Sequence, residues 1–396
     1  MPDAKVILKP RMARPLYSRH PWLFEKAIDR LEGEPAPSDE VQVQTDRGEF
    51  VAFGLFNPQS RIRVRLYSWD HEQRVDADLI VRRMKEAIQF RKEALRLDDP
   101  RGACRLIYSE SDGLSGLIVD RFADACTIQI NSLAMERFLP SITQTLIEEV
   151  SPNIIVRRTD ATVAHWESMT ATEEILLGKD RSEPIVFEES GLLFLVDPIR
   201  GQKTGGYLDQ RDNRRSAAFY AAGRDVLDAF CYAGGFGLTA SKLGHARSVT
   251  FLDSSAEAKT LAEKNAQAND IPATFLLGDA GRMMGDLARE GRKFGMVVCD
   301  PPKFASKASE IEGALRGYEF INRSAIHLLE PGGILVSCSC SGLITPSDFL
   351  EMLAESAIRA GREIRVLEMR GQAPDHPVSL ACPETAYLKC VIARVV

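Results

Sequence analysis

The sequence predicts an α/β protein built from three segments, each marked by its own pattern of strand-like and helix-like runs. Residues 1–70 hold short alternating runs separated by turn residues, which is typical of a small β-rich domain. Residues 71–190 mix helical spacing with strand-like runs, which indicates an α+β domain. Residues 191–396 alternate strand and helix patterns, which predicts a parallel sheet flanked by helices.

Composition excludes several classes of protein. No apolar run approaches the ~18 residues of a membrane span, and the N-terminus lacks a signal-peptide core, so we expect a cytoplasmic protein without a membrane partner. The eight cysteines are too dispersed for a disulfide framework. The single C-x-C motif lacks the second pair that a zinc site needs, so no metal is expected. Free thiols and an exposed sheet edge permit a homodimer without requiring one.

In the β-rich segment, the runs VQVQT, GEFVAFGLF and RIRVRLY predict strands. The last run places Arg61, Arg63 and Arg65 at alternate positions, so on a strand all three face the same side. Such a face suits an RNA phosphate backbone, and it equally suits a charged edge strand exposed to water. Both interpretations remain open, although the net charge of −6 argues weakly against a general binder of polyanions.

In the middle segment, apolar residues at helical spacing predict a helix from Asp76 to Leu97. The runs GLIVDRF, ACTIQIN and NIIVRRT predict strands, and SITQTLIEEV predicts a helix before the last of them. No catalytic cluster is recognisable in this segment.

In the third segment, DVLDAF, SVTFLD, ATFLLGD, MVVCDPP and GILVSCS predict successive strands joined by helices. A helix is expected over 317–329, before the last of these strands. EIRVLEM and AYLKCVIARVV are joined by a stretch without a long helical pattern, so these final strands are expected to form a terminal hairpin.

A Gly-rich turn and four acids predict a nucleoside site at one edge of this sheet. VLDAFCYAGGFGLTA (226–240) is a strand, a Gly-rich turn and a helix, but it lacks the G-x-G-x-x-G and G-x-x-x-x-G-K-[ST] spacings. Asp228 precedes the turn, while Asp253, Asp279 and Asp300 follow the next strands. Ligands of open α/β sheets bind at these strand ends, although an Asp there also commonly caps a helix. With Asp253 on a ribose and Asp279 on adenine, the set favours S-adenosylmethionine over NAD.

The motifs CDPPKFA (299–305) and SCSCSG (337–342) suggest chemistry on a planar base. The two prolines leave nearby carbonyls free to accept hydrogen bonds, and Phe304 can stack on a base. If the two strands are neighbours, Cys340 lies beside Asp300. A Cys340 thiolate that adds to C6 of a pyrimidine turns C5 into a nucleophile, and Asp300 can hold N3. A base must then remove the C5 proton. Cys338, inside the strand, is expected to pack as a small apolar residue.

The sequence resembles the large-subunit rRNA (cytosine-5) methyltransferase I family over nearly its whole length. The resemblance is carried by GQKTGGYLDQRDNR (201–214), DAFCYAGGFG (228–237), DPPKF (300–304), SCSG (339–342), DHP (375–377), HPWLF (20–24) and ESDGLSGLIVDRF (110–122). It implies a PUA domain that binds RNA over 1–70, a central α+β domain over 71–190, and a Rossmann-like class I methyltransferase domain over 191–396. It also implies S-adenosylmethionine as cofactor and 5-methylcytosine in large-subunit rRNA as product.

The resemblance makes Cys340 the expected nucleophile, with Asp300 beside it. Lys303 stands where many RNA cytosine-5 enzymes carry a second cysteine that helps to release the product, so another base is needed. Glu384 is the first candidate, by its similarity to a C-terminal glutamate of uracil-5 methyltransferases, and His376 is the second.

The remaining site residues are assigned by binding role. Cofactor binding is expected at Gln210, Asp228, Phe230, Tyr232, Gly234, Gly235, Asp253, Asp279 and Asp300. RNA contact is expected at Lys303, Phe304, Arg61, Arg63 and Arg65.

Two other functions fit the same motifs. A non-covalent RNA guanine or adenine N-methyltransferase would use DPPKF alone, with Cys340 as a small packed residue. The second alternative is an RNA-binding protein with a degenerate methyltransferase fold. The intact Gly-rich turn and the strand-end acids argue against it.

Overall fold

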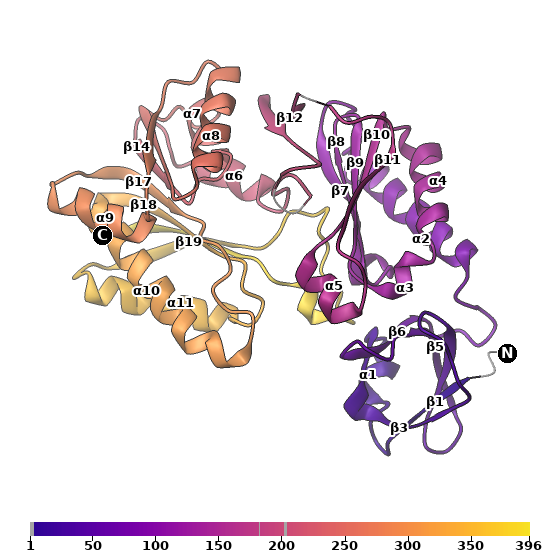
Figure 1. Ribbon diagram of the computed structural model, residues 1–396. Helices are drawn as coiled ribbons and strands as arrows, with labels where there is room; N and C mark the ends of the chain where they lie inside the picture. The colour runs from indigo at the N-terminus through magenta and orange to yellow at the C-terminus, as the bar shows by residue number, and fades with distance from the viewer. Residues whose placement is uncertain (1–3, 182, 202–203) are drawn as a thin grey trace. The chain divides into compact units, whose positions relative to one another are not determined.

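The computed structural model describes residues 4–181, 183–201 and 204–396 (Figure 1). Residues 202–203 of the GQKTGG run therefore lie outside the described residues. The chain divides into two compact units. The first comprises Met1–Phe187, Val196–Leu208 and Pro374–Thr385; the second comprises Glu188–Leu195, Asp209–Ala373 and Ala386–Val396. No described helix is long and apolar enough to cross a membrane.

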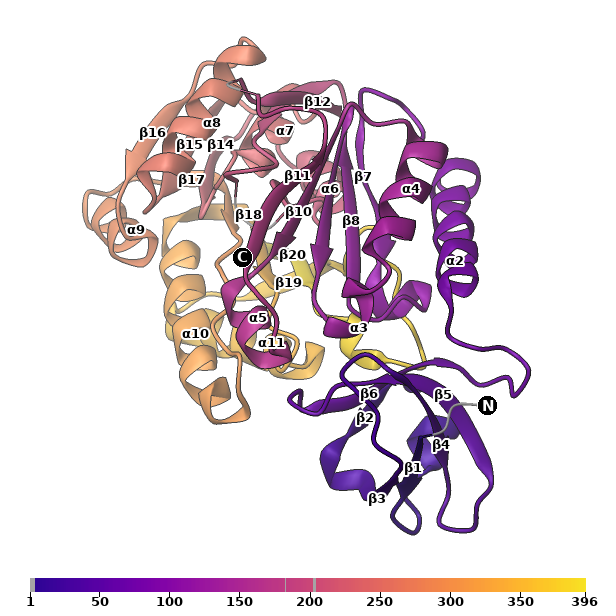
Figure 2. The same cartoon turned by 45° about the vertical axis from the view of Figure 1, so that its right-hand side comes forward.

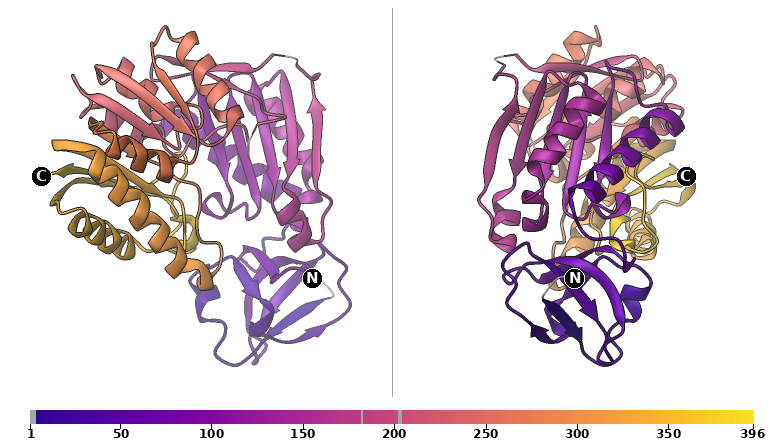
Figure 3. Two further views of the ribbon diagram at one scale, coloured as in Figure 1. Left: turned by 60° about the vertical axis from the view of Figure 1, so that its left-hand side comes forward. Right: turned by 90° about the vertical axis from the view of Figure 1, so that its right-hand side faces the viewer.

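The first unit begins with a six-stranded sheet in the order β2-β6-β5-β4-β1-β3, curled around its own core (Figure 3). Its elements are β1 (Lys5–Leu8), α1 (Arg14–Tyr17), β2 (Trp22–Phe24), β3 (Ile28–Glu32), β4 (Glu40–Gln44), β5 (Phe50–Phe56) and β6 (Ile62–Ser68). Strand residues such as Val6, Val41 and Val64 are fully buried inside it. The strands predicted from VQVQT, GEFVAFGLF and RIRVRLY are confirmed as β4, β5 and β6.

A five-stranded sheet in the order β11-β10-β9-β8-β7 follows, with α2 and α4 side by side on one face (Figure 2). Its strands are β7 (Ala103–Tyr108), β8 (Leu117–Phe122), β9 (Ala125–Ile130), β10 (Ile154–Thr159) and β11 (Thr172–Leu177). Its helices are α2 (Ala77–Gln89), α3 (Leu133–Glu136), α4 (Leu139–Val150) and α5 (Ala161–Glu167). Phe53 and Tyr67 of the first sheet pack into this second core, so the two sheets share apolar packing.

The helix predicted from Asp76 to Leu97 is regular only over α2, which ends at Gln89. Asp76 caps α2 by accepting from the backbone N–H of Leu79, and α2 gives way to a π-helical turn over Phe90–Ala94. That turn buries Arg91, which pairs with Asp112 at 2.7 Å. The spacing of apolar residues continues through the turn, which is why the sequence alone predicts one long helix.

The second unit contains a seven-stranded sheet in the order β16-β15-β14-β17-β18-β20-β19. Its strands are β14 (Asp225–Ala229), β15 (Ser248–Asp253), β16 (Thr274–Leu277), β17 (Phe294–Cys299), β18 (Leu329–Ser339), β19 (Ile364–Arg370) and β20 (Lys389–Val395). The first five strands in this order are parallel to their neighbours, and β20 runs antiparallel to both β18 and β19. The predicted parallel sheet and terminal strand pair are both confirmed.

Helices cover both faces of this sheet (Figure 1). They are α6 (Arg211–Ala218), α7 (Gly235–Lys242), α8 (Ala256–Ala268), α9 (Ala280–Arg289), α10 (Ile311–Leu328) and α11 (Pro346–Arg359). α9, α10 and α11 pack together on one face, while α6 packs on α7. The helix expected over 317–329 is α10, which begins earlier, at Ile311. A short hairpin of β12 (Ile185–Glu189) and β13 (Leu192–Val196) precedes the sheet.

Candidate active site

The turn between β14 and α7 has an unusual backbone. Phe230, Tyr232 and Gly234 have positive φ angles of 61°, 47° and 78°. Two of these residues are not glycine, and such conformations persist only where the surrounding structure holds them. Buried Asp228 holds the turn by accepting a hydrogen bond of 2.8 Å from the backbone N–H of Gly237.

The glycines of this turn are required by close packing. A Cβ on Gly235 would lie 2.7 Å from the Nε atom of Arg214, whose guanidinium pairs with Glu189 at 2.7 Å. A Cβ on Gly237 would lie 2.4 Å from the ring of Phe251. These glycines therefore let the turn and the start of α7 pack closely against Arg214 and Phe251.

The strand-end acids Asp253 and Asp279 do not have the same contacts. The carboxylate of Asp253 accepts from the backbone N–H groups of Tyr232 and Ser255, both at 2.9 Å, so it supports the turn while remaining partly exposed. Asp279 caps α9 by accepting from the backbone N–H of Arg282 at 2.8 Å. The sequence allows Asp279 either to bind a ligand or to cap a helix, and the structure shows that it caps α9.

Asp228 is a buried strand-end acid with a strongly perturbed pKa. Its burial, together with the nearby carboxylates Asp300 and Asp253, raises its pKa to about 8, although the Gly237 N–H acts in the opposite direction. A carboxyl in this state is largely protonated at neutral pH. Asp228 therefore acts as a neutral support of the turn at that pH.

Asp300 follows β17 directly and is anchored by Gln210. The side-chain amide of Gln210 donates to the Oδ2 atom of Asp300 at 3.1 Å, and its own carbonyl accepts from Asn213 at 2.6 Å. Gln210 precedes α6 and is buried, so two predicted site residues from distant parts of the sequence meet at this sheet edge. Gln210 here positions the carboxylate of Asp300.

The two cysteines of SCSCSG lie in different surroundings, as the sequence predicts. The parallel register pairs Cys299 with Ser337, so Asp300 and the end of β18 emerge at the same edge of the sheet. Cys338 is fully buried, and this burial raises its pKa well above the ordinary value. Cys340 lies just beyond β18, and among the described residues it is the one cysteine that is not buried.

A buried hydroxyl network holds the backbone around Cys340. The Ser339 hydroxyl donates to the Tyr318 hydroxyl at 3.0 Å, and the Tyr318 and Ser341 hydroxyls lie 3.2 Å apart. The backbone N–H of Ala305, just after DPPKF, donates to the Ser341 hydroxyl at 3.5 Å. Alternate residues point to opposite faces here, so the serines fix the strand exit from the α10 side.

Lys389 is a buried cation at this edge that sequence reasoning missed. It begins β20, opposite Ser339 in the antiparallel register, and its ammonium donates to the carbonyls of Ser341 at 2.6 Å and Tyr387 at 2.9 Å. It is 9% exposed. The signal that was available is a lysine at the start of the otherwise apolar strand KCVIARV.

Phe304 and Lys303 follow the prolines of DPPKF on the outer side of this edge. The ring of Phe304 lies 4.7 Å from the ring of Tyr318, at a tilt of 43°. Phe304 also lines a shallow pocket with Glu310, Gly313, Ala314 and Gly317. Lys303 is exposed. An aromatic ring beside a depression and an exposed cation are suitable for a base and a phosphate.

The two candidate bases lie on the segment Pro374–Thr385, which packs within the first unit. His376 is buried, and its Nδ1 atom lies 3.1 Å from a carboxylate oxygen of Asp375. Glu384 is exposed, with Oε2 lying 3.3 Å from His20 Nε2 and 3.5 Å from Cys382 Sγ. The structure thus shows Glu384 in a polar cluster of the first unit.

His20, Cys382 and Glu384 have potential ligand atoms within 4.8 Å of one another, which is a spacing compatible with a metal ion. However, the backbone N–H of Trp22 donates to His20 Nδ1 at 3.3 Å. In a neutral imidazole this leaves the proton on Nε2, directed at Glu384. That arrangement fits a hydrogen bond between His20 and Glu384 better than a metal site.

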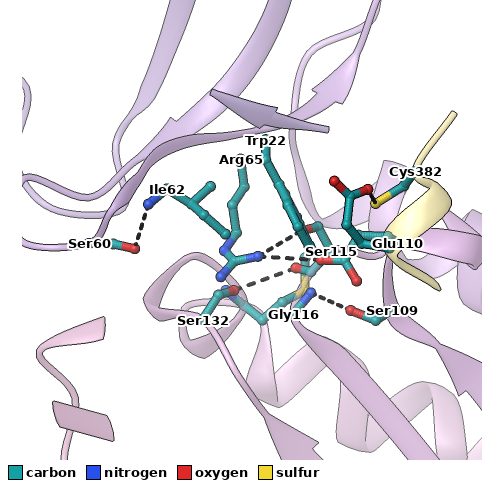
Figure 4. A network of polar contacts seen from close by, with 12 residues as sticks. Trp22, Ser60, Ile62, Arg65, Ser109, Glu110, Ser115, Gly116, Ser132 and Cys382 are labelled. Carbon is teal, nitrogen blue, oxygen red and sulfur yellow. Dashed lines mark hydrogen bonds and ion pairs between the residues drawn. The ribbon is translucent and has the colours of Figure 1, made fainter. Parts of the chain in front are cut away.

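Arg61, which precedes β6, and Arg63 and Arg65 within it do not form one exposed face, which corrects the interpretation of the sequence. Arg65 is buried and pairs with Glu110 at 3.4 Å (Figure 4). It also pairs with Glu167 at 2.9 Å. Arg63 is largely covered and pairs with exposed Glu25 at 2.8 Å, whereas Arg61 is exposed. Arg65 therefore joins two sheets of the first unit and is not available to RNA.

Comparison with known proteins agrees with the domain order. Residues 6–69 match a PUA-like domain, and residues 160–393 match an S-adenosylmethionine-dependent methyltransferase. A solved methyltransferase complexed with SAH shares the fold, with a TM-score of 0.84 and 18% identity over 98% of this chain and 99% of that one. A structure described as a SAM-dependent methyltransferase from Streptococcus mutans gives 0.83 at 17% identity, with the same coverage.

Relatives of known name match along the whole chain. The ribosomal RNA large subunit methyltransferase I of Aeromonas hydrophila is 40% identical over 396 residues, covering 99% of each chain. Its namesake from Aeromonas salmonicida is 41% identical over 382 residues, covering 96% of each. The chain therefore belongs to the ribosomal RNA large subunit methyltransferase I family and is an S-adenosylmethionine-dependent methyltransferase.

Proposed function

We propose that this protein methylates C5 of a cytosine in large-subunit rRNA through a covalent bond between Cys340 and C6 of the base. The observation that carries the proposal is the placement of Cys340, the one described cysteine that is not buried, at the same sheet edge as Asp300. The names of the relatives support large-subunit rRNA as the substrate. A cytoplasmic location belongs to the same proposal.

The residues at the end of β14 and β15 fit S-adenosylmethionine. Gly234 and Gly235 let the turn pack closely against Phe251 and Arg214, and this holds the backbone at the end of β14, the strand end at which open α/β sheets bind ligands. The partly exposed carboxylate of Asp253 suits the two hydroxyls of a ribose. We assign Phe230, Tyr232 and Asp279 to the same site, with S-adenosylmethionine supplying an electrophilic methyl group.

In the proposed reaction, the Cys340 thiolate adds to C6 of the cytosine, and the displaced electron pair makes C5 nucleophilic. Asp300, held by Gln210, is placed to bind N3 and to favour this addition. After C5 has accepted the methyl group, a base removes the C5 proton, the C5–C6 double bond re-forms and the thiolate leaves. We retain Glu384 and His376 as candidates for that base.

RNA contact is proposed at Phe304, Lys303, Arg61 and Arg63. Phe304 would stack on a base turned out of the RNA, and the lysine and arginines would contact phosphates. Arg65 is left out because its charge is already paired with buried Glu167.

The first test replaces each cysteine of the motif in turn. We expect Cys340→Ala to abolish methylation of large-subunit rRNA, measured by mass spectrometry of digested RNA, because no thiolate remains to activate C5. The matched control is Cys338→Ala, which removes the buried thiol two residues away and should keep activity. RNA containing 5-fluorocytosine should form a denaturation-resistant complex with the wild type and not with Cys340→Ala.

The same experiment separates the alternatives. Methylation that survives in Cys340→Ala, on a guanine or adenine, would instead support the non-covalent N-methyltransferase. If the wild type produces no heat with S-adenosylmethionine in calorimetry, the degenerate RNA-binding fold is favoured and the proposal fails.

A further inference from the structure

The start of β20 brings a buried cation against the backbone that carries Cys340. Lys389 lies opposite Ser339, and its ammonium donates to the carbonyl of Ser341, the residue that follows Cys340. A second N–H of the ammonium donates to the carbonyl of Tyr387. The third N–H makes no hydrogen bond with any described residue. An ammonium has three donors, so these two bonds leave one donor unused.

The charged groups around this ammonium come from three other elements. They are Cys340 after β18, Asp348 on α11, and Lys303 after β17. Burial raises the pKa of the Tyr318 hydroxyl on α10, and a charge on Cys340 raises it further, so Tyr318 adds no charge of its own beside the sulfur. Asp348 is partly exposed, and it accepts hydrogen bonds from the Thr345 hydroxyl at 2.7 Å and the Thr345 backbone N–H at 2.9 Å. Its charge is therefore shared with a helix cap as well as with Lys389.

We propose that Lys389 is a positioning residue that holds the strand exit around Cys340 and keeps a positive charge beside its sulfur, which favours the thiolate. The catalytic meaning of this charge rests on the proposed role of Cys340 as nucleophile. The thiolate is the reactive form at attack, and it is also the group that leaves at product release, so a fixed cation assists both steps. The ammonium does not itself gain or lose a proton in the reaction.

The electrostatics of the lysine agree with this role. Burial lowers the pKa of Lys389 to about 8, and the sulfur of Cys340 acts against that lowering. Coupling between two titrating groups is reciprocal, so a cation stabilised by the thiolate stabilises the thiolate in return. A buried lysine without such a partner would favour its neutral form more strongly.

The test measures alkylation of Cys340 by iodoacetamide as a function of pH, with mass spectrometry to identify the modified cysteine. The other seven cysteines are buried, so Cys340 is the site expected to react in the folded protein. In Lys389→Met, which keeps the length of the side chain without its charge, we expect the midpoint of the pH profile to rise by about one unit. The rate at neutral pH should then fall roughly tenfold.

Two further variants separate charge from structure. Lys389→Arg keeps the charge and should restore a midpoint near that of the wild type. Tyr318→Phe removes hydroxyl contacts from the same strand exit without removing the cation, and should leave the midpoint unchanged. Thermal melting of each variant establishes that it is folded. An unshifted midpoint in folded Lys389→Met, or an equal shift in Tyr318→Phe, would overturn the inference.

The outcomes also distinguish this inference from the proposed function. If Cys340→Ala keeps methylation while Lys389→Met shifts the alkylation midpoint, the charge pairing stands and the covalent mechanism fails. If Cys340→Ala loses methylation while Lys389→Met leaves the midpoint unchanged, the mechanism stands and Lys389 has only a structural role.

Discussion

At the scale of single residues, burial decides what each predicted side chain can do. The position of Asp228 before the Gly-rich turn predicts a contact with the cofactor, which stays a prediction, and the structure adds that Asp228 is buried and bonded to the backbone of Gly237. The position of Arg65 on β6 predicts that it contacts RNA, but in the structure Arg65 is paired with a buried glutamate. In both cases the sequence predicts the strand correctly, while the environment of the side chain depends on contacts from distant elements.

Asp228 should make the stability of the protein fall as the pH rises. Its pKa is about 8 in the folded chain and 3.8 in its ordinary state, so the folded form binds more protons between these values. The stability it contributes is fully present below about pH 4 and is progressively lost toward pH 8. We expect Asp228→Asn, which can still accept from Gly237, to flatten the decline of the melting temperature between pH 6 and pH 8.

Asp225, on the same strand, provides a control of opposite sign. Hydrogen bonds from Arg247 and Ser248 lower the pKa of Asp225 to about 2. The stability it contributes is present above its ordinary pKa of 3.8 and is lost as the pH falls toward 2. Asp225→Asn should therefore leave the profile between pH 6 and pH 8 unchanged. Parallel melting profiles for the wild type and Asp228→Asn over that range would contradict the assignment.

At the scale of elements, the close packing of α7 on β15 explains the glycines of the turn. Motif reasoning predicts that glycine is needed where backbone approaches a ligand, and Gly234 with its positive φ agrees with this. Gly237 has another cause, the ring of Phe251, which no local pattern in the sequence reveals. The spacing of apolar residues also could not reveal the π-helical turn after α2. That turn buries Arg91 against Asp112, a residue distant in the sequence.

Two helical glycines should respond to alanine in opposite directions. Gly237→Ala would place a Cβ 2.4 Å from Phe251 and 2.7 Å from Val249, and should destabilise the protein by about 1–3 kcal/mol through overpacking. Gly285→Ala, inside α9, meets no atom within 4 Å and should stabilise by about 0.5–1 kcal/mol. Thermal melting measures both, and a loss of stability in each variant would contradict this account of the packing.

At the scale of the whole molecule, the motifs predicted the family, and the full-length matches to its curated members confirm it. The sequence also predicted the alternation of strands and helices that places Asp300 and Cys340 at one sheet edge. It could not show that Pro374–Thr385 packs within the first unit, because that placement depends on long-range contacts such as Asp375 with the backbone of Arg105. Lys389 was missed for the same reason.

The first unit should depend strongly on the buried pairing of Arg65. Arg65→Ala would leave the buried carboxylate of Glu167 without its partner, which typically costs about 3–5 kcal/mol. Arg63→Ala, two residues away on β6, breaks a pairing with exposed Glu25 and should cost less than about 1 kcal/mol. Urea unfolding of the full chain compares them, and equal midpoints for the two variants would contradict the buried pairing.

The most direct test of the central claim maps 5-methylcytosine at nucleotide resolution in large-subunit rRNA. Bisulfite sequencing would compare rRNA from cells that contain the wild-type protein, the Cys340→Ala variant or neither. We predict one methylated cytosine that is present with the wild type and absent from the other two. An unchanged methylation map in all three, or a site that persists in Cys340→Ala, would contradict covalent methylation of cytosine through Cys340.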